Sequence, residues 1–231
     1  MPEPPKSAQI RQWVERLEGK YGRARPIARF DALEELVCCI ISQHTADANS
    51  FPAFIRLRST FPNWADIEAA GPERVADCIR KAGLANQKGK NIVGCLKSIR
   101  ERFGDYNLEP LRDMGPLEAR KWLMALPGVG PKTASLVLCF NFEMPVFPVD
   151  THVYRVSWRL GLIPKDLGEA KAHDALLALV PGDLAHRFHM ALIQHGRMVC
   201  RAPVPDCGAC VLAVDCPSAG SLASARKAVA V

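Results

Sequence analysis

The segment Leu126-Pro-Gly-Val-Gly-Pro-Lys-Thr-Ala134 most constrains how this chain folds, because two glycines and two prolines within nine residues force a tight backbone turn. Gly128 and Gly130 allow positive φ and close approach of another backbone. Pro131 has a preset φ and no amide hydrogen, so it suits the first position of a helix. The sequence therefore predicts a turn followed by a helix that begins at about Pro131.

The start of that helix is also a predicted anion site. Its free amide groups and positive dipole end, together with the glycines, form a cradle for one phosphate. Lys132 lies in the first helical turn, where a second positive charge is disfavoured and a neutral, nucleophilic amine is favoured. The simpler alternative is a tight turn with a solvated lysine. The flanking apolar residues favour two short helices packed through a hairpin, and these residues are Leu123, Leu126, Val129, Ala134, Val137 and Leu138.

This string resembles the helix-hairpin-helix signature of the DNA glycosylase superfamily. The lysine at position 132 makes it similar to the bifunctional endonuclease III branch. The resemblance implies that Lys132 is catalytic. It also implies that the hairpin contacts DNA through Gly128, Val129, Gly130 and Thr133.

Length and composition fit a compact soluble protein of one or two closely joined domains. The chain has 231 residues, of which 48% are hydrophobic, and no apolar run reaches the length of a membrane span. The N-terminal residues lack an apolar signal region, so we expect a cytoplasmic protein, and the resemblance adds association with the nucleoid. The net charge of +6 lies wholly within residues 80–102, a basic strip that favours a polyanionic partner over a merely solvated helix face.

Apolar periodicity and Gly, Pro and Asn punctuation predict helices almost throughout, with no convincing strand. The expected ranges are about 6–19, 31–43, 45–58, 72–81, 87–103, 117–125, 131–141, 151–161, 169–179 and 184–199.

Four cysteines near the C-terminus predict a metal centre. Cys200, Cys207, Cys210 and Cys216 fall within 17 residues, and a cytosolic chain has little reason to pair them as disulfides. Spacing alone leaves a 4Fe-4S cluster and a zinc site open, although the single Cys-x2-Cys fits paired zinc ligands poorly. The same spacing occurs in endonuclease III-like glycosylases, so the resemblance implies a 4Fe-4S cluster with a structural role. The other five cysteines lie in apolar stretches and are expected to be buried thiols.

Asp150 precedes an apolar helix and is expected to be its N-cap. The resemblance assigns the matching aspartate to catalysis, where a carboxylate would stabilise positive charge developing on the sugar. Capping and catalysis are compatible. The histidines at positions 152, 186, 189 and 195 lie on predicted helices and are expected to have structural roles.

Two further loops are candidate wedges for opening a duplex. Leu84 lies between two predicted helices in a loop that resembles the intercalating-leucine loop of endonuclease III. Residues 41–47 resemble the family's other wedge, but His44 stands where many members have glutamine, and Gln43 precedes it. Either side chain could hydrogen-bond the base left unpaired when its partner is extruded. The alternative is a local hydrogen bond at the end of a helix.

The resemblance covers about residue 10 to Cys216 and implies an all-α, two-domain helix-hairpin-helix DNA glycosylase fold. A six-helix barrel is expected over 30–136, an iron-sulfur cluster domain over 1–29 with 137–217, and a tail over 218–231. Lys132 and Asp150 would face one cleft. The implied activity is a monomeric, bifunctional glycosylase and AP lyase on double-stranded DNA with damaged bases, chiefly oxidised pyrimidines, or abasic sites. The alternatives are a thymine or adenine mismatch glycosylase and a weakly active iron-sulfur DNA-binding paralogue.

Overall fold

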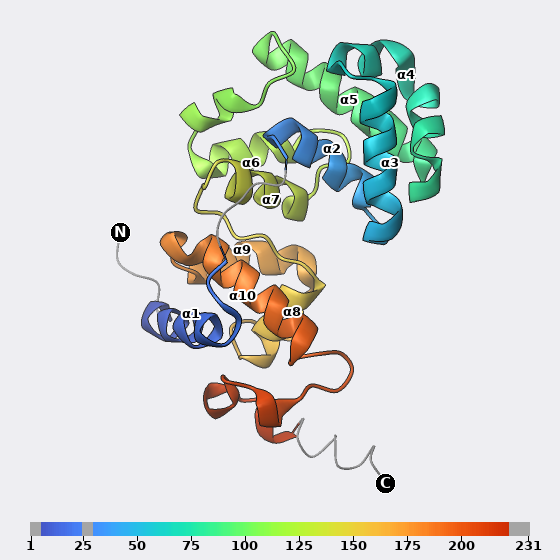
Figure 1. Ribbon diagram of the computed structural model, residues 1–231. Coiled ribbons are helices and arrows are strands. Elements are labelled where there is room, and N and C mark those ends of the chain that lie inside the picture. Colours follow the sequence, from blue (N-terminus) through green and yellow to red (C-terminus); the bar gives the residue numbers. More distant parts are fainter. Residues whose placement is uncertain (1–5, 25–29, 222–231) are drawn as a thin grey trace. The chain divides into compact units, whose positions relative to one another are not determined.

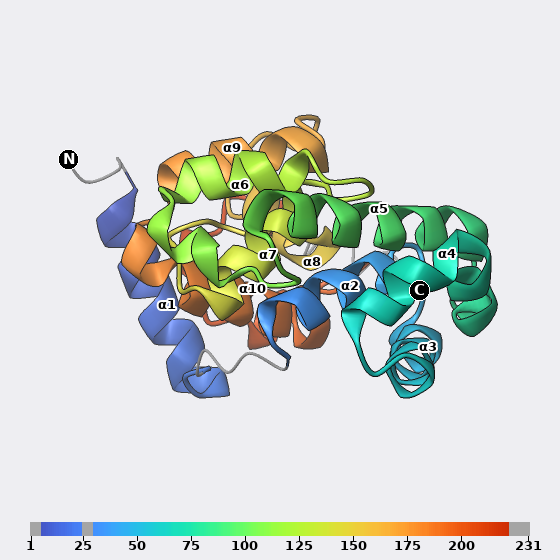
Figure 2. The ribbon, with the colours of Figure 1, turned by 90° about the horizontal axis from the view of Figure 1, so that it is seen from above.

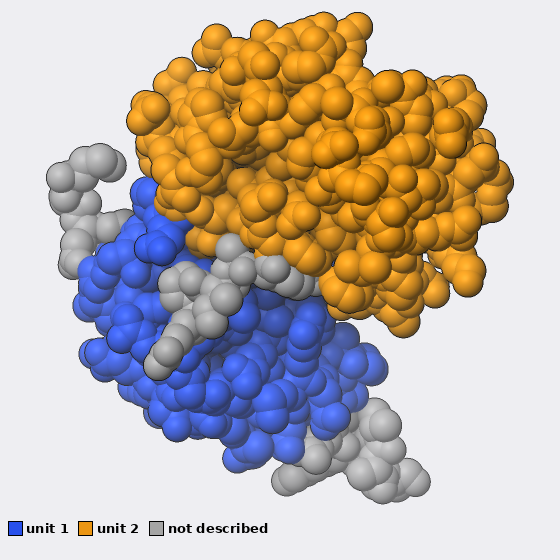
Figure 3. Space-filling model, turned by 45° about the horizontal axis from the view of Figure 1, so that its top comes forward, with its two compact units in different colours: residues 1–27, 143–231 blue, residues 28–142 orange. Residues whose placement is uncertain are grey.

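The computed structural model describes residues 6–24 and 30–221, and every regular element within these ranges is a helix (Figures 1 and 2). The prediction of an all-α chain is confirmed. The chain forms two compact units, residues 1–27 with 143–231 (unit 1) and residues 28–142 (unit 2), as coloured in Figure 3. Within the described ranges, no helix is both long and apolar enough to cross a membrane.

Unit 2 contains six α-helices among its described residues, as expected for the barrel. They are α2 (Ala32–Ser42), α3 (Asp47–Thr60), α4 (Trp64–Cys78), α5 (Ala85–Phe103), α6 (Pro116–Met124) and α7 (Pro131–Asn141), with short 3-10 helices η1 (Arg80–Ala82) and η2 (Glu109–Asp113).

Helix α2 is the central helix of unit 2. Asp31 caps its first turn by accepting a hydrogen bond from the Glu34 amide at 2.8 Å. Its apolar residues face in several directions, as expected of a helix surrounded by others, and α3, α5 and α7 pack against it. Five of these side chains are almost fully buried, namely Leu33, Leu36, Val37, Ile40 and Ile41.

Helices α4 and α5 pack closely. A Cβ atom added at Gly89 would lie 2.5 Å from the Pro72 carbonyl oxygen, so only glycine permits this approach. Helix α4 consists of two pieces joined at Gly71, whose φ is +79°. The sequence predicted only the second piece, as 72–81; the helical turns before Gly71 were missed, and the second piece ends earlier, at Cys78.

Unit 1 joins an N-terminal helix to the C-terminal part of the chain. Its elements are α1 (Ser7–Tyr21), α8 (Thr151–Arg159), α9 (Glu169–Leu179), η3 (Gly182–Leu184), α10 (Ala185–Met198), η4 (Cys207–Ala209) and η5 (Ala213–Asp215). Trp13, Phe147 and Phe188 are buried in one apolar core, to which α1, α8, α9, η3 and α10 contribute.

Ion pairs fasten α1 to the remainder of unit 1. Arg187 donates two hydrogen bonds to the Glu18 carboxylate, at 2.8 and 2.6 Å, and holds the pKa of that carboxyl below its ordinary value. The Trp13 indole and the Arg16 guanidinium both donate to Asp215, at 3.0 and 2.6 Å. The N-terminal helix thereby supports the segment that carries the last of the four clustered cysteines.

The division between the units differs from the expected domain boundary. A boundary at 136/137 would fall inside α7, which runs to Asn141, whereas the units divide at 142/143. Val137 and Leu138 are fully buried on the same helix as Lys132, so all of α7 belongs to unit 2. Of the expected tail 218–231, residues 222–231 lie outside the described residues, as do residues 1–5 and 25–29 of the expected N-terminal part.

Candidate DNA interface and metal pocket

The hairpin has the predicted local structure. Helix α6 ends at Met124, Gly128 has a φ of +74°, and α7 begins at Pro131 with Gly130 as its N-cap. Glycine has no side chain, so no side-chain hydrogen bond caps this helix end. The first amide groups of α7 are therefore suited to bind an external anion.

The rest of unit 2 occupies the carbonyl groups of this turn. The Gln43 side-chain amide donates to the Gly128 carbonyl at 2.8 Å, and the Cys95 thiol donates to the Pro127 carbonyl at 3.0 Å. Asn91 packs beneath the turn so closely that a Cβ atom at Gly128 would lie 2.2 Å from its Nδ2. Two oxygens that would repel a phosphate thus already accept hydrogen bonds, and position 128 requires glycine.

Lys132 lies where the sequence predicted, in the first turn of α7, and its side chain is exposed. Burial raises the pKa of the Cys39 thiol on α2. The positive charge of Lys132 lies close enough to this thiol to oppose part of that rise. Val129 and Thr133 beside it are buried, at 6% and 7% exposure. Of these two residues, only backbone groups are available to contact a phosphate.

The two candidate wedge loops both carry a non-glycine residue with positive φ. His44 has a φ of +53° and is exposed, and Leu84 has a φ of +51° and is 63% exposed. Gln43 is half-buried because its amide is directed to the hairpin. His44 is therefore the polar side chain that this loop presents to solvent.

The basic strip of residues 80–102 carries less free surface charge than the sequence implied. Lys88 is buried and 2% exposed, so its assignment to this strip was wrong. The carboxylates of unit 2 pair three further members, as Arg80 with Asp77, Lys97 with Glu101 and Arg100 with Glu68. The exposed members without an ion pair among the described residues are Lys81, Lys90 and Arg102.

Asp150 is the N-cap of α8, as predicted. Its Oδ1 accepts a hydrogen bond from the Val153 amide at 2.7 Å, and the residue is half-buried. Oδ2 makes no hydrogen bond to any residue that the structure describes. This carboxylate oxygen is therefore available to interact with a bound molecule. Asp150 belongs to unit 1 and Lys132 to unit 2.

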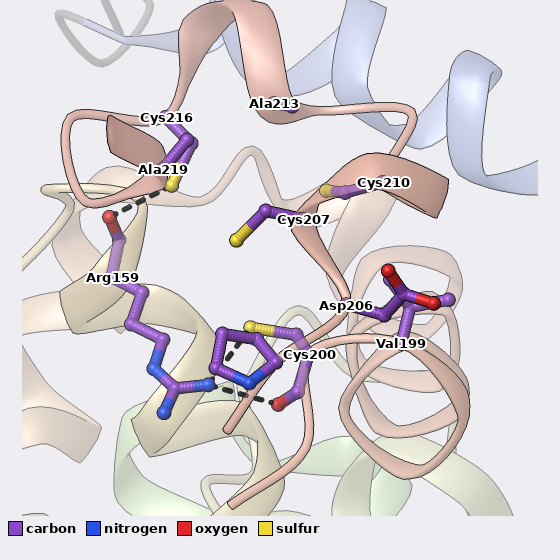
Figure 4. Close-up of a pocket in the computed structure, with 10 residues that line it drawn as sticks. Arg159, Val199, Cys200, Asp206, Cys207, Cys210, Ala213, Cys216 and Ala219 are labelled. Atoms are coloured by element: carbon purple, nitrogen blue, oxygen red, sulfur yellow. Dashed lines mark hydrogen bonds between the residues drawn. The ribbon is translucent and has the colours of Figure 1, made fainter. Parts of the chain in front are cut away.

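The four C-terminal cysteines line one cavity in unit 1, as Figure 4 shows. The amide of Leu212 donates to the Cys210 sulfur at 3.4 Å, and burial is the main cause of a raised pKa for both Cys210 and Cys216. No three His, Cys, Asp or Glu side chains among the described residues are arranged to hold a single ion. Four convergent thiols with a backbone amide donor nevertheless fit a thiolate-ligated cluster, in which each sulfur binds a different iron.

Two arginines of α8 organise this cavity, and sequence reasoning missed both. Arg159 is only 4% exposed and donates to the Cys200 carbonyl and sulfur at 3.2 and 3.3 Å, and to the Arg201 and Pro203 carbonyls at 2.9 and 3.3 Å. The Arg159 carbonyl accepts from the Cys216 thiol at 3.2 Å (Figure 4). Arg155, one turn earlier, donates to the Cys200 carbonyl at 3.0 Å. The spacing of two arginines by four residues on an apolar helix was the available signal.

His189 and His195 both make structural contacts. His189 is buried with its Nδ1 2.9 Å from the Pro148 carbonyl oxygen. His195 is also buried, with Nδ1 2.9 Å from the Tyr21 hydroxyl and Nε2 3.4 Å from the Cys210 sulfur. The sequence did not anticipate this last contact, which links α10 to the cysteine cavity.

The remaining cysteines are thiols of the apolar interior. Cys38, Cys78, Cys95 and Cys139 are buried, and Cys39 is half-buried. Burial raises the pKa of Cys95 and of Cys139 to about 12. Cys95 and Cys139 are thus protonated thiols at neutral pH. The prediction of buried thiols is confirmed for Cys38, Cys78, Cys95 and Cys139, but Cys39 is only partly buried.

Comparison with known proteins identifies the family. The family model of the HhH-GPD superfamily base excision DNA repair proteins matches residues 37–181. The chain belongs to this superfamily. A putative DNA glycosylase of Arabidopsis thaliana is 36% identical over 191 residues, which cover 81% of this chain and 65% of the plant protein. The chain thus spans just under two thirds of that relative's length.

Other relatives match over a larger share of their own length. Endonuclease III of Thermotoga maritima is 32% identical over 186 residues, covering 80% of this chain and 83% of the relative. A solved non-covalent complex of endonuclease III with DNA matches with a TM-score of 0.76 and 29% identity, covering 93% of this chain and 96% of that chain. The chain is therefore an endonuclease III-like DNA glycosylase, an enzyme of base excision repair.

Proposed function

We propose that this enzyme is a bifunctional DNA glycosylase and AP lyase that removes damaged, chiefly oxidised, pyrimidines from double-stranded DNA. One observation carries the proposal: the exposed amine of Lys132 lies in the first turn of α7, directly beside an uncapped helix N-terminus. A DNA phosphate held by that helix end would bring a sugar close to the amine.

The hairpin would bind the DNA backbone through its amide groups. Gly128, Gly130 and the buried Val129 and Thr133 offer backbone rather than side-chain contacts, so this contact carries no sequence information. The exposed lysines at positions 81 and 90 would add sequence-independent attraction to the polyanion. This suits an enzyme that must examine DNA of any sequence.

Extruding a nucleotide requires something to fill the space it leaves. We assign this role to His44 and Leu84, which are both exposed on loops of unit 2. His44 would hydrogen-bond the orphaned base, and Leu84 would separate the neighbouring bases. Gln43 would support them by holding the loop to the hairpin through its hydrogen bond to Gly128.

Lys132 would act as the nucleophile. Its neutral amine attacks C1′, the C1′–N bond breaks, and the base leaves with that electron pair and takes up a proton. The nitrogen then loses a proton, the C1′–O4′ bond breaks as O4′ leaves with its electron pair and takes up a proton, and a protonated Schiff base results. This cation acidifies the C2′ proton, whose removal expels the 3′ phosphate as the C3′–O bond breaks. Water then hydrolyses the imine and regenerates Lys132.

Asp150 would stabilise the positive charge that develops on the sugar while the base departs. Its Oδ1 caps α8, which fixes the orientation of the carboxylate, and Oδ2 is the oxygen left to face the substrate. The same carboxylate could carry protons to and from the amine.

Cys200, Cys207, Cys210 and Cys216 would hold a 4Fe-4S cluster, which supplies structural cross-linking of the C-terminal segment and the capacity for electron transfer. The Arg159 guanidinium and the Leu212 amide donate to the sulfurs of Cys200 and Cys210 and would stabilise them as thiolates. Iron analysis and the visible absorbance of the purified protein distinguish this cluster from colourless zinc.

Arg159→Met is expected to lower the iron content per chain, and to lower the free energy of unfolding by about 1–3 kcal/mol, because the hydrogen bonds of a buried guanidinium to the Cys200 sulfur and to the carbonyls of Arg201 and Pro203 are lost. Iron analysis and urea unfolding measure the two effects. Arg197→Met, which changes an exposed arginine of the same unit, is the control and should alter neither. Wild-type iron content in Arg159→Met would show that the guanidinium does not organise the ligands.

Borohydride trapping tests the proposed function. The wild-type protein is incubated with a duplex that contains one abasic site, sodium borohydride is added, and a covalent adduct is sought on a denaturing gel. The same protein is assayed for excision on a thymine glycol duplex and on a thymine-guanine mismatch. An adduct and thymine glycol excision support the proposal; excision without an adduct would reveal a monofunctional glycosylase, and neither would reveal an inactive binding paralogue.

A further inference from the structure

Lys88 is a buried cation that contacts both candidate wedge loops. Its ammonium nitrogen lies 2.6 Å from the Ile41 carbonyl oxygen, 2.8 Å from Thr45 Oγ1 and 2.8 Å from the Ala82 carbonyl oxygen. Ile41 and Thr45 flank His44 on one side of this contact, and Ala82 precedes Leu84 on the other. One side chain therefore joins the two loops.

The three acceptors explain why a lysine is stable in this position. An ammonium group has three donors, and each has one oxygen here, so no N–H of the buried side chain is left unsatisfied. The carbonyls of Ile41 and Ala82 lie at the C-terminal ends of α2 and η1, where the helix dipole favours a cation. Burial lowers the pKa of Lys88, and these oxygens oppose that effect by stabilising the charged form.

Thr45 strengthens the same link. Its hydroxyl accepts from Lys88 and lies within hydrogen-bond distance of the Ala82 carbonyl, so the loops are joined both directly and through the lysine. The first loop is also joined to the hairpin, because Gln43 donates to Gly128. These contacts connect the three segments to which the proposed function assigns DNA contacts.

Both loops hold a residue in an unfavourable backbone conformation. His44 and Leu84 have φ values of +53° and +51°, in a region of backbone conformation that residues other than glycine seldom adopt. Such conformations persist only where the surrounding structure imposes them. The contacts of Lys88 and Thr45 lie within four residues of both positions and supply that constraint.

We propose that Lys88 is a positioning residue that locks the loops of residues 43–46 and 80–84 into one preformed, two-point wedge. This inference rests on the proposed function, since it explains how the duplex is opened. Separating stacked bases costs a few kcal/mol, and loops that had to become ordered at the same moment would add a further entropic cost. Loops that are already locked avoid this second cost. Lys88 acts through His44 and Leu84, without itself touching DNA.

The test compares three variants. Lys88→Met keeps most of the side-chain length but removes all three donors, and Thr45→Val removes only the hydroxyl at nearly constant volume. Lys121→Met changes an exposed lysine of α6 in the same unit and serves as the control. Each is assayed for excision of thymine glycol from a fully paired duplex, and for borohydride trapping at an abasic site inside an unpaired bubble, where no base pair has to be opened.

We expect Lys88→Met to lower excision from the paired duplex about tenfold relative to trapping in the bubble, the effect of losing one or more buried hydrogen bonds. Thr45→Val should shift this ratio in the same direction by less, and Lys121→Met should leave it unchanged. Equal loss of both activities would indicate general destabilisation and overturn the proposal, as would an unchanged ratio in Lys88→Met.

Hydrogen exchange gives a readout that does not depend on catalysis. In Lys88→Met and in Thr45→Val, amide exchange should accelerate in residues 43–46 and 80–84 together, while the core of α2 stays protected. Acceleration in one loop only, or in neither, would overturn the coupling. If the wild-type protein excised nothing and formed no adduct, the proposed function would fail, yet this experiment would still decide whether Lys88 joins the loops.

Discussion

Lys132→Ala is expected to abolish the borohydride-trapped adduct with abasic DNA and to lower strand cleavage by about 10³-fold or more, which corresponds to about 4 kcal/mol of transition-state stabilisation. The amine is the atom that forms the covalent bond, and alanine offers no replacement. The side chain is exposed, so the free energy of unfolding should change by less than about 0.5 kcal/mol. Single-turnover cleavage, denaturing gels and urea unfolding measure the three quantities.

The control for this prediction is Lys121→Ala. Lys121 is an exposed lysine on α6, the first helix of the hairpin, so it shares the charge and the neighbourhood of Lys132 but does not lie at the helix N-terminus. It should form the adduct at the wild-type rate. Should Lys132→Ala still be trapped normally, another amine would be the nucleophile and the assignment of Lys132 would be wrong.

The hairpin and the helical fold could be predicted from the sequence because both depend on local chemistry. Proline is favoured at the start of a helix and disfavoured in its interior, which places Pro131 at the start of α7, and Gly128 has the positive φ that the turn requires. Asp150 likewise caps the helix that follows it, through an amide only three residues away. Interactions of this range are fixed by the order of residues along the chain.

The partners of side chains that come from distant segments could not be predicted in this way. The charge pattern of residues 80–102 predicts Lys88 as part of a basic strip. Lysine is seldom buried without a carboxylate partner, yet here two helix ends supply its acceptors. One signal was overlooked: Lys88 lies four residues before the buried Ile92, on the apolar face of α5. The pairing of Gln43 with Gly128 spans 85 positions, and no local pattern marks it.

Arg159 shows the same limit at the cysteine cavity. The four thiols and their spacing were evident in the sequence, but the guanidinium that holds the Cys200 carbonyl comes from a helix about forty positions earlier. A buried arginine becomes meaningful only when the carbonyls around it are known. Tertiary packing determines which carbonyl groups surround the arginine, and that packing cannot be read from a single sequence.

Asp150→Asn is expected to lower the rate of base excision by 10²- to 10⁴-fold, about the contribution of one positioned acid-base group. Asparagine keeps the shape of the side chain and an oxygen that accepts from the Val153 amide, so the cap of α8 is retained. The negative charge and the second carboxylate oxygen are lost, and with them the stabilisation of a cationic sugar and the capacity to carry a proton. Single-turnover excision measures the rate, and gel-shift titration should show largely unchanged DNA binding.

Two companion variants separate the charge from the cap. Asp150→Ala removes both, so it should cost about 1 kcal/mol of folding stability in addition to the loss of excision. Asp31→Asn makes the same chemical change at the N-cap of α2, where Asp31 accepts from the Glu34 amide, and it should leave excision intact. Wild-type excision in Asp150→Asn combined with a loss in Asp150→Ala would restrict Asp150 to capping. Equal loss of excision in both variants would instead require the ionised carboxylate, because that is the feature of aspartate that both variants lack.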